Sequence, residues 1–214
     1  MTRITRILAL LVALFASQAA QAALTCSISA PAMDFGTLTT VPFPQTDTTP
    51  NLSINCTGGS AGATVRICVG ITPGTWVGTA SPQRFMSSGT DNIEFQIYSD
   101  ASHSTVWGGV LPLFAGGMQE PLPAIVLGSA GNGSANYPMY GRILNPPAQT
   151  EVPGTYTSSL QFTGKFPSGG SPCSGGSGSS TLFSSGSFQA QVAVASSCSV
   201  VAADIDFGAT ATCA

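Results

Sequence analysis

The residues of this chain that could do covalent chemistry are few: a single histidine, His103, and six cysteines among 214 residues. A serine adds one more candidate, because Gly58-Gly-Ser60-Ala-Gly62 matches the G-x-S-x-G nucleophile elbow of hydrolases. That motif works where a strand turns into a helix and a histidine accepts the proton of the serine. The residues after Gly62 alternate like a strand. The sequence therefore predicts no active site here, and a secreted serine hydrolase is the least favoured alternative.

The cysteines favour disulfides over a metal site. None of them lies in a C-x-x-C pair, and a single histidine leaves zinc without enough ligands. We therefore predict no metal, no cofactor and no catalytic residue, so the protein is not expected to be an enzyme. In an oxidising compartment the cysteines should pair, and six cysteines allow fifteen pairings. The six are Cys26, Cys56, Cys68, Cys173, Cys198 and Cys213.

Residues 1–22 have the layout of a secretory signal peptide. Arg3 and Arg6 give a positive start, residues 7–16 are apolar and uncharged, and Ala20-Gln-Ala22 forms an A-x-A cleavage site. The apolar run is too short to cross a bilayer as a helix. We expect export through the inner membrane to the periplasm, and then release or display at the cell surface. After cleavage four cations remain against nine acids, a net charge of about −5, which argues against a nucleic-acid partner.

Short alternating segments indicate that strands position the cysteines. Residues 167–182 are mostly Gly, Ser and Pro and predict a linker. Residues 23–166 are enough for one sandwich domain with its own core. No segment after the signal peptide predicts a helix, so the expected class is all-β. Apolar residues recur with a period of two at 52–56, 65–71, 93–97, 156–166 and 188–194.

An internal repeat lies on both sides of the linker. The sequence Cys26-Ser-Ile-Ser-Ala-Pro-Ala-Met-Asp-Phe-Gly36 returns as Cys198-Ser-Val-Val-Ala-Ala-Asp-Ile-Asp-Phe-Gly208, with identical spacing from Cys to Asp-Phe-Gly. The repeat predicts that residues 183–214 begin a second, similar domain, which we expect to be incomplete because so few residues cannot enclose a core. Asp-Phe-Gly itself suits a strand end, where Asp bonds nearby backbone and Gly takes a positive φ.

These residues together resemble the spore coat protein U domain family, which includes subunits of archaic chaperone-usher pili. The resemblance implies an immunoglobulin-like β-sandwich, with which the alternating strands agree, and a disulfide between Cys26 and Cys56. Cys68 lies on a predicted strand without a nearby partner, and we pair it with Cys173. Ser158 departs from the family, which often has an Asp there. The resemblance is carried by the two cysteines around Asp34-Phe-Gly36, by Arg84-Phe-Met86, by residues 95–108, by Tyr140-Gly-Arg-Ile143 and by Pro153-Gly-Thr-Tyr156.

Subunits of such pili resemble one another in lacking a final strand, which a neighbouring subunit supplies from its N-terminal extension. The alternating apolar residues ahead of the second repeat copy are predicted to be such a donor strand: Phe188, Ala190, Val192 and Val194. The mature chain offers only residues 23–25 ahead of the first copy, which places its first domain at the tip of a fibre. The resemblance thus implies a structural or adhesive tip subunit that mediates surface attachment and biofilm formation.

The implied partners are a periplasmic pilus chaperone, an outer-membrane usher and neighbouring pilin subunits, with no stable membrane insertion. Two further alternatives stay open. A shaft pilin or coat-type protein would bind no ligand, but its mature N terminus should carry a donor strand. In the other alternative, residues 188–194 fold back into the chain's own first domain and make a self-complemented protein, which the flexible linker makes reachable.

Several predicted loops carry more apolar side chains than a solvated loop needs. Exposed apolar patches mark interaction surfaces, so we hypothesise that these loops contact hydrophobic or host surfaces. The alternative is that they pack under the sandwich as part of its core. The residues in question are Phe43, Trp76, Leu111, Leu113 and Phe114.

Overall fold

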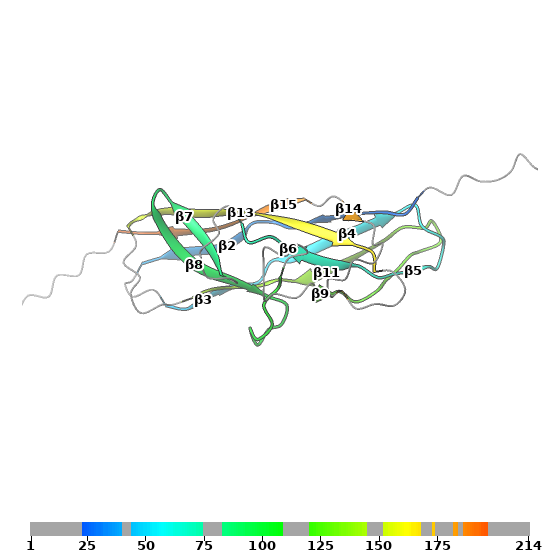
Figure 1. The fold of residues 1–214 in the computed structure, drawn as a ribbon, viewed down its shortest axis with the longest axis horizontal. Coiled ribbons are helices and arrows are strands. Elements are labelled where there is room, and N and C mark those ends of the chain that lie inside the picture. Colours follow the sequence, from blue (N-terminus) through cyan, green and yellow to red (C-terminus); the bar gives the residue numbers. More distant parts are fainter. Residues whose placement is uncertain are drawn as a thin grey trace, which may run out of the picture.

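The computed structural model describes residues 23–39, 44–74, 83–108, 120–144, 152–167, 173, 182–183 and 186–196. Every regular element in these ranges is a β-strand, and Figure 1 shows the strands layered in an elongated sandwich. The predicted class, an all-β immunoglobulin-like sandwich, is confirmed. Within the same ranges the structure contains no helix long and apolar enough to span a membrane.

The strands are short, and most alternate buried and exposed side chains as the period of two predicts. β13 is the longest, with 12 residues, and lies centrally in the larger sheet. In order, the strands are β1 (Thr25–Ser29), β2 (Met33–Leu38), β3 (Thr46–Thr48), β4 (Asn51–Thr57), β5 (Thr64–Val65), β6 (Cys68–Ile71), β7 (Arg84–Ser88), β8 (Asp91–Tyr98), β9 (Glu120–Pro121), β10 (Ile125–Val126), β11 (Gly133–Pro138), β12 (Tyr140–Ile143), β13 (Gly154–Lys165), β14 (Leu182–Phe183) and β15 (Ser187–Val194).

Two sheets form the sandwich. The smaller has the order β1-β4-β11, and the larger has ten strands, seven of them in the order β2-β15-β13-β7-β8-β12-β3. β14, β6 and β9 attach to the larger sheet off that path, and β5 pairs separately with β10. β15, the last of the described strands, therefore lies inside the larger sheet between β2 and β13.

The chain crosses between the two sheets at prolines. Pro31 separates β1 from β2, Pro50 separates β3 from β4, and Pro138 ends β11 just before β12. A proline has no N–H for a sheet ladder and holds φ near −65°, so it ends a strand and turns its direction. Two of the crossings meet, because the Met139 N–H donates to the Pro50 carbonyl at 2.9 Å. At each of these prolines the chain therefore leaves one sheet and enters the other, so that β1 and β2, β3 and β4, and β11 and β12 lie in different sheets.

A buried arginine joins the core to the loops around it. The Arg84 side chain is fully buried, and burial lowers its pKa to about 9, so it remains charged at pH 7. Its Nε donates to the Thr72 carbonyl at 3.2 Å and its Nη2 to the carbonyls of Ile71 and Trp107 at 3.0 and 2.7 Å, while Nη1 donates to Gln96 Oε1. The Arg84-Phe-Met motif is therefore structural, because its cation holds together several separate segments.

Two disulfides lie in the described part of the chain. Cys26 and Cys56 face each other directly on β1 and β4, with their Cα atoms 4.1 Å apart. Cys68 at the start of β6 bonds to Cys173, with a Cα–Cα distance of 5.5 Å. These are the pairs expected above. Cys198 and Cys213 lie outside the described residues.

Candidate functional site

The strand predicted to be a donor lies in the sheet of its own chain. β15 pairs antiparallel with β13 over eight residues, from Gly154 opposite Val194 to Gln161 opposite Ser187. On its other side it runs parallel to β2, and β2 is the outermost strand of this path. The space between β2 and β13 that β15 fills is called the strand site below. While β15 lies there, it is not available to a neighbouring subunit.

The four predicted donor residues all point into the core. Phe188 and Val194 are each 6% exposed, and Ala190 and Val192 are fully buried. Phe188 stacks on Phe162 of β13, with ring centroids 4.7 Å apart and an interplanar angle of 14°. Burying a Val or Phe side chain stabilises a fold by roughly 1.5–3 kcal/mol, so this strand contributes substantially to the stability of the sandwich.

Backbone hydrogen bonds fix both ends of β15. At its start the Gly186 N–H donates to the Ile28 carbonyl at 3.1 Å, and the Phe162 N–H donates to the Gly186 carbonyl at 3.1 Å. At its end the Ala195 N–H donates to the Leu38 carbonyl at 2.9 Å. β15 thus connects β1, β2 and β13, which are far apart in sequence.

The Asp-Phe-Gly motif forms a bulge in β2 beside β15, so the expectation that it ends a strand is wrong. Between the paired positions Asp34–Gln191 and Thr37–Ala193, β2 has two residues where β15 has one. Gly36 takes the positive φ expected of it, 76°, and its N–H donates to Asp34 Oδ1 at 2.8 Å. Gln191 Nε2 donates to Asp34 Oδ2 at 3.0 Å. The motif therefore contacts the last strand directly.

These two hydrogen bonds also set the charge state of Asp34. Both donate to the carboxylate and favour its ionised form, so they lower the pKa of Asp34 below its usual value, with the Gly36 N–H as the larger cause. The carboxylate is exposed and stays charged at neutral pH. β2 therefore presents a fixed negative charge next to the exposed face of β15.

Ser158 lies inside the strand site and close to Gly74. It lies on β13 directly opposite Ala190 and is 1% exposed, and among the described residues its hydroxyl has no hydrogen-bond partner. A Cβ added to Gly74, which has φ of +102°, would meet the Ser158 Oγ at 2.3 Å. Where the family often has Asp, this chain therefore has a small side chain enclosed by Gly74.

A tyrosine near the start of β13 holds this strand against the loop before it. The Tyr156 ring is fully buried, and its hydroxyl donates to the Val152 carbonyl, four residues upstream, at 2.8 Å. The same arrangement forms the tyrosine corner of immunoglobulin-like domains. Trp107 is 1% exposed and its Nε1 donates to the Val69 carbonyl at 2.9 Å, so this tryptophan of the family motif packs in the core.

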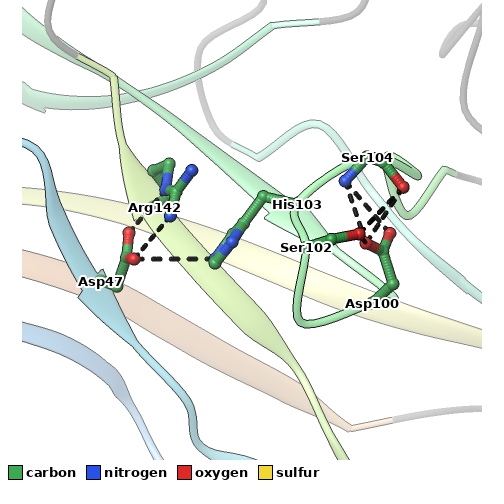
Figure 2. Close-up of polar contacts among 6 residues, drawn as sticks. All are labelled: Asp47, Asp100, Ser102, His103, Ser104 and Arg142. Atoms are coloured by element: carbon green, nitrogen blue, oxygen red, sulfur yellow. Dashed lines mark hydrogen bonds and ion pairs between the residues drawn. The ribbon is translucent and has the colours of Figure 1, made fainter.

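A second polar cluster surrounds the turn after β8, and Figure 2 shows its two halves. Asp100 accepts hydrogen bonds from the backbone N–H groups of Ser104 and Thr105 and from the hydroxyls of Ser102 and Ser104. These bonds, the Ser102 hydroxyl first, hold the pKa of Asp100 well below its usual range. His103 takes a left-handed φ of 56° in this turn. Asp100 therefore fixes a tight loop.

The other half of the cluster joins this turn to the edge strand β3. His103 Nε2 lies 3.9 Å from Asp47 Oδ2. The Arg142 guanidinium donates to both oxygens of Asp47 at 2.7 Å, and this is the main reason why the pKa of Asp47 is lowered. The rings of Tyr98 and Tyr140 contact His103 edge to face. These contacts give the single histidine a structural role.

The sequence matches a known protein family over most of its length. Residues 11–163, more than half of the sequence, match the Spore Coat Protein U domain. The chain belongs to this family. Membership supports the class of chaperone-usher pilus subunit or adhesin, which is displayed at the cell surface, rather than an enzyme. No curated protein matches the chain.

Solved structures that resemble the chain include pilus subunits. The CupB6 tip adhesin from Pseudomonas aeruginosa has 13% identity and a TM-score of 0.44, and the match covers 76% of this chain and 40% of that one. The CooA pilin subunit from enterotoxigenic Escherichia coli has 10% identity and a TM-score of 0.39, covering 79% and 98%. The CssB subunit of colonization factor CS6, complemented with a donor strand from CssA, has 11% identity and a TM-score of 0.37, covering 78% and 97%.

The hydrolase alternative finds no support in the geometry. Ser60 is exposed in the turn between β4 and β5, and its carbonyl accepts the Ala63 N–H at 3.1 Å. A strand follows this turn, whereas a nucleophile elbow requires a helix. Within the described ranges no group of three or more His, Cys, Asp or Glu side chains could hold a metal ion.

Several predictions fall on residues whose structure is not described. The proposed surface-contact residues Phe43, Trp76, Leu111, Leu113 and Phe114 all lie outside the described residues, as do the signal peptide and most of the linker. The second repeat copy, residues 198–208, also lies outside them. The domain boundary at residue 183 stays a prediction, but β15, which follows it, lies in the sheet of the first domain.

Proposed function

We propose that this chain is an exported subunit of a chaperone-usher pilus, that it stands at the fibre tip, and that it attaches the cell to surfaces and promotes biofilm formation. The observation that carries the proposal is the strand site, which is filled by β15 of the same chain. A subunit whose strand site is already filled does not accept a strand from a neighbour there. A first domain completed in this way suits the distal end of a fibre, because it receives no strand from a neighbour.

The repeat supports the same position. Its second copy begins at Cys198, directly after β15, so one chain would carry a completed sandwich followed by the start of a pilin-like domain. The second domain would then make the contact with the next subunit by strand complementation, with a periplasmic chaperone and an outer-membrane usher acting before assembly. The apolar loop residues around Phe114 would face outward from the tip and form the contact surface.

Immunogold labelling tests the tip position. An epitope inserted at the exposed turn of Gly89 and Thr90, between β7 and β8, should leave both sheets intact, because this turn only closes a hairpin. We expect gold at fibre ends in the source organism. Gold along the whole fibre would support the shaft-pilin alternative, and fibres without gold would reject a role in the pilus.

The proposed contact loops are tested separately. Leu113→Ser and Phe114→Ser should reduce attachment to a hydrophobic surface and biofilm mass while leaving the thermal midpoint of the purified chain unchanged. Exposed side chains contribute little to stability, whereas core side chains contribute several kcal/mol. A lower thermal midpoint without a specific loss of attachment would show that these residues belong to the core. The matched control is Val126→Ser, which replaces a described, exposed apolar residue.

A further inference from the structure

The apolar residues of β15 differ in size, and each meets a different partner on β13. Phe188 lies opposite Leu160 and Val192 lies opposite Tyr156, whereas Ala190 lies opposite Ser158. A small side chain of the strand thus meets a small side chain of the site, while Val194 lies opposite Gly154. Among the buried residues of β15, Ala190 is therefore the one small side chain, and it lies between the larger Phe188 and Val192.

Space at Ser158 is limited on the side away from β15 as well. Gly74 closes that side, since even one added carbon there would collide with the Ser158 hydroxyl. Protein interiors are close-packed, and adding methylene groups to a filled core forces neighbouring atoms to move. A side chain larger than alanine opposite Ser158 would therefore displace the strand or the loop.

A second contact distinguishes positions along the exposed face of β15. Gln189 and Gln191 both lie on this face, but Gln191 is the one that donates to Asp34. Asp34 is held at this point by the bulge in β2 and by the Gly36 N–H. The carboxylate therefore marks one fixed position along the strand site.

We propose that the strand site selects a strand in which a small residue is followed at once by a glutamine, and that Ala190 and Gln191 fix the register of β15. A slip of one residue would turn the glutamines into the core. A slip of two residues would bring either Phe188 or Val192 opposite Ser158. This selectivity would make the site prefer the chain's own strand over strands of other subunits. That consequence rests on the proposed function.

Exchanging two residues of β15 tests the proposal directly. Phe188→Ala combined with Ala190→Phe moves the small residue two positions earlier, and Gln189 then follows it. The register should shift by two so that the small residue again lies opposite Ser158. Engineered cysteine pairs report the register, as the native pair Cys26 and Cys56 shows that directly opposed cysteines on antiparallel strands can form a disulfide.

In the unchanged strand, Ser159→Cys should cross-link with Gln189→Cys, its direct partner. In the exchanged strand, Ser159→Cys should instead cross-link with Ser187→Cys, as detected by mass spectrometry of proteolytic fragments. An exchanged strand that still cross-links through position 189 overturns the proposal. The measurement uses the isolated full chain, so it is independent of whether the protein forms a pilus tip.

A charge substitution tests the glutamine contact without changing the core. Gln191→Glu places a second carboxylate against Asp34 and should lower the thermal midpoint at pH 7 by about 2 to 4 °C. The difference should disappear at a pH low enough to protonate both groups. The matched control, Gln189→Glu, should leave the midpoint unchanged, because Gln189 faces Ser159. Equal effects of the two substitutions would overturn the assignment of Gln191.

Discussion

Truncating Val192 tests whether β15 occupies the strand site in solution. The Val192 side chain is fully buried opposite Tyr156. Val192→Ala removes two methyl groups, worth about 0.8 kcal/mol each, and leaves a cavity that adds a term of similar size. We therefore expect a loss of about 2 to 3 kcal/mol in the free energy of unfolding. For a chain of this length that corresponds to a decrease of roughly 4 to 12 °C in the thermal midpoint.

The assay is urea unfolding followed by circular dichroism, with thermal melts in parallel. The control is Gln189→Ala on the same strand, because Gln189 is exposed and its truncation should change stability by less than about 0.5 kcal/mol. The dependence of the free energy on urea should stay the same in both variants if the folded state is unchanged. If Val192→Ala costs no more than Gln189→Ala, β15 does not fill the strand site in the isolated chain, and the argument for a self-completed subunit fails.

Three further predictions concern the rest of the sandwich. Replacing the Cys68–Cys173 bridge with alanines should cost about 4.8 kcal/mol and replacing Cys26–Cys56 about 3.6, because the closed loops span 105 and 30 residues; urea unfolding that gives the opposite order would contradict the chain-entropy argument. Arg84→Met should cost at least about 3 kcal/mol in the same assay, because it leaves buried carbonyl oxygens without their donor, and a neutral result would contradict this account of the core. Asp34→Asn should lower the thermal midpoint at neutral pH, and the difference from the unchanged chain should shrink as pH falls below about 4. The reason is that a carboxylate with a lowered pKa stabilises the fold above its unfolded pKa and loses this effect as it is protonated; a difference that does not depend on pH would refute it.

Much of the fold follows from local pattern. Alternation of apolar residues predicted the strands at 52–56, 93–97 and 156–166, because each has one face in the core and one in solvent. The glycine of Asp34-Phe-Gly36 was expected at positive φ, and it has φ of 76°. Its location within β2 was not predicted, since a bulge becomes visible only when the partner strand β15 is known.

The polar contacts were less predictable. Nothing in the sequence near Asp34 indicates Gln191, which is 157 residues away. Arg84 looked like an ordinary motif residue, yet its guanidinium is buried and bonded to three separate segments, at residues 71–72, Gln96 and Trp107. Such contacts depend on which loops the fold brings together, and sequence spacing carries no information about that.

The sequence by itself determined the strands, the family and the segment with a donor-like apolar face, because these depend on residue type and short-range periodicity. It left open whether residues 188–194 would complete a neighbour or their own chain, since the same alternating face serves both. Only the tertiary structure decided where β15 lies in the chain described here. The linker allows the strand to return, and the space between β2 and β13, with its small residue at Ser158 and its carboxylate at Asp34, fits that strand in one register.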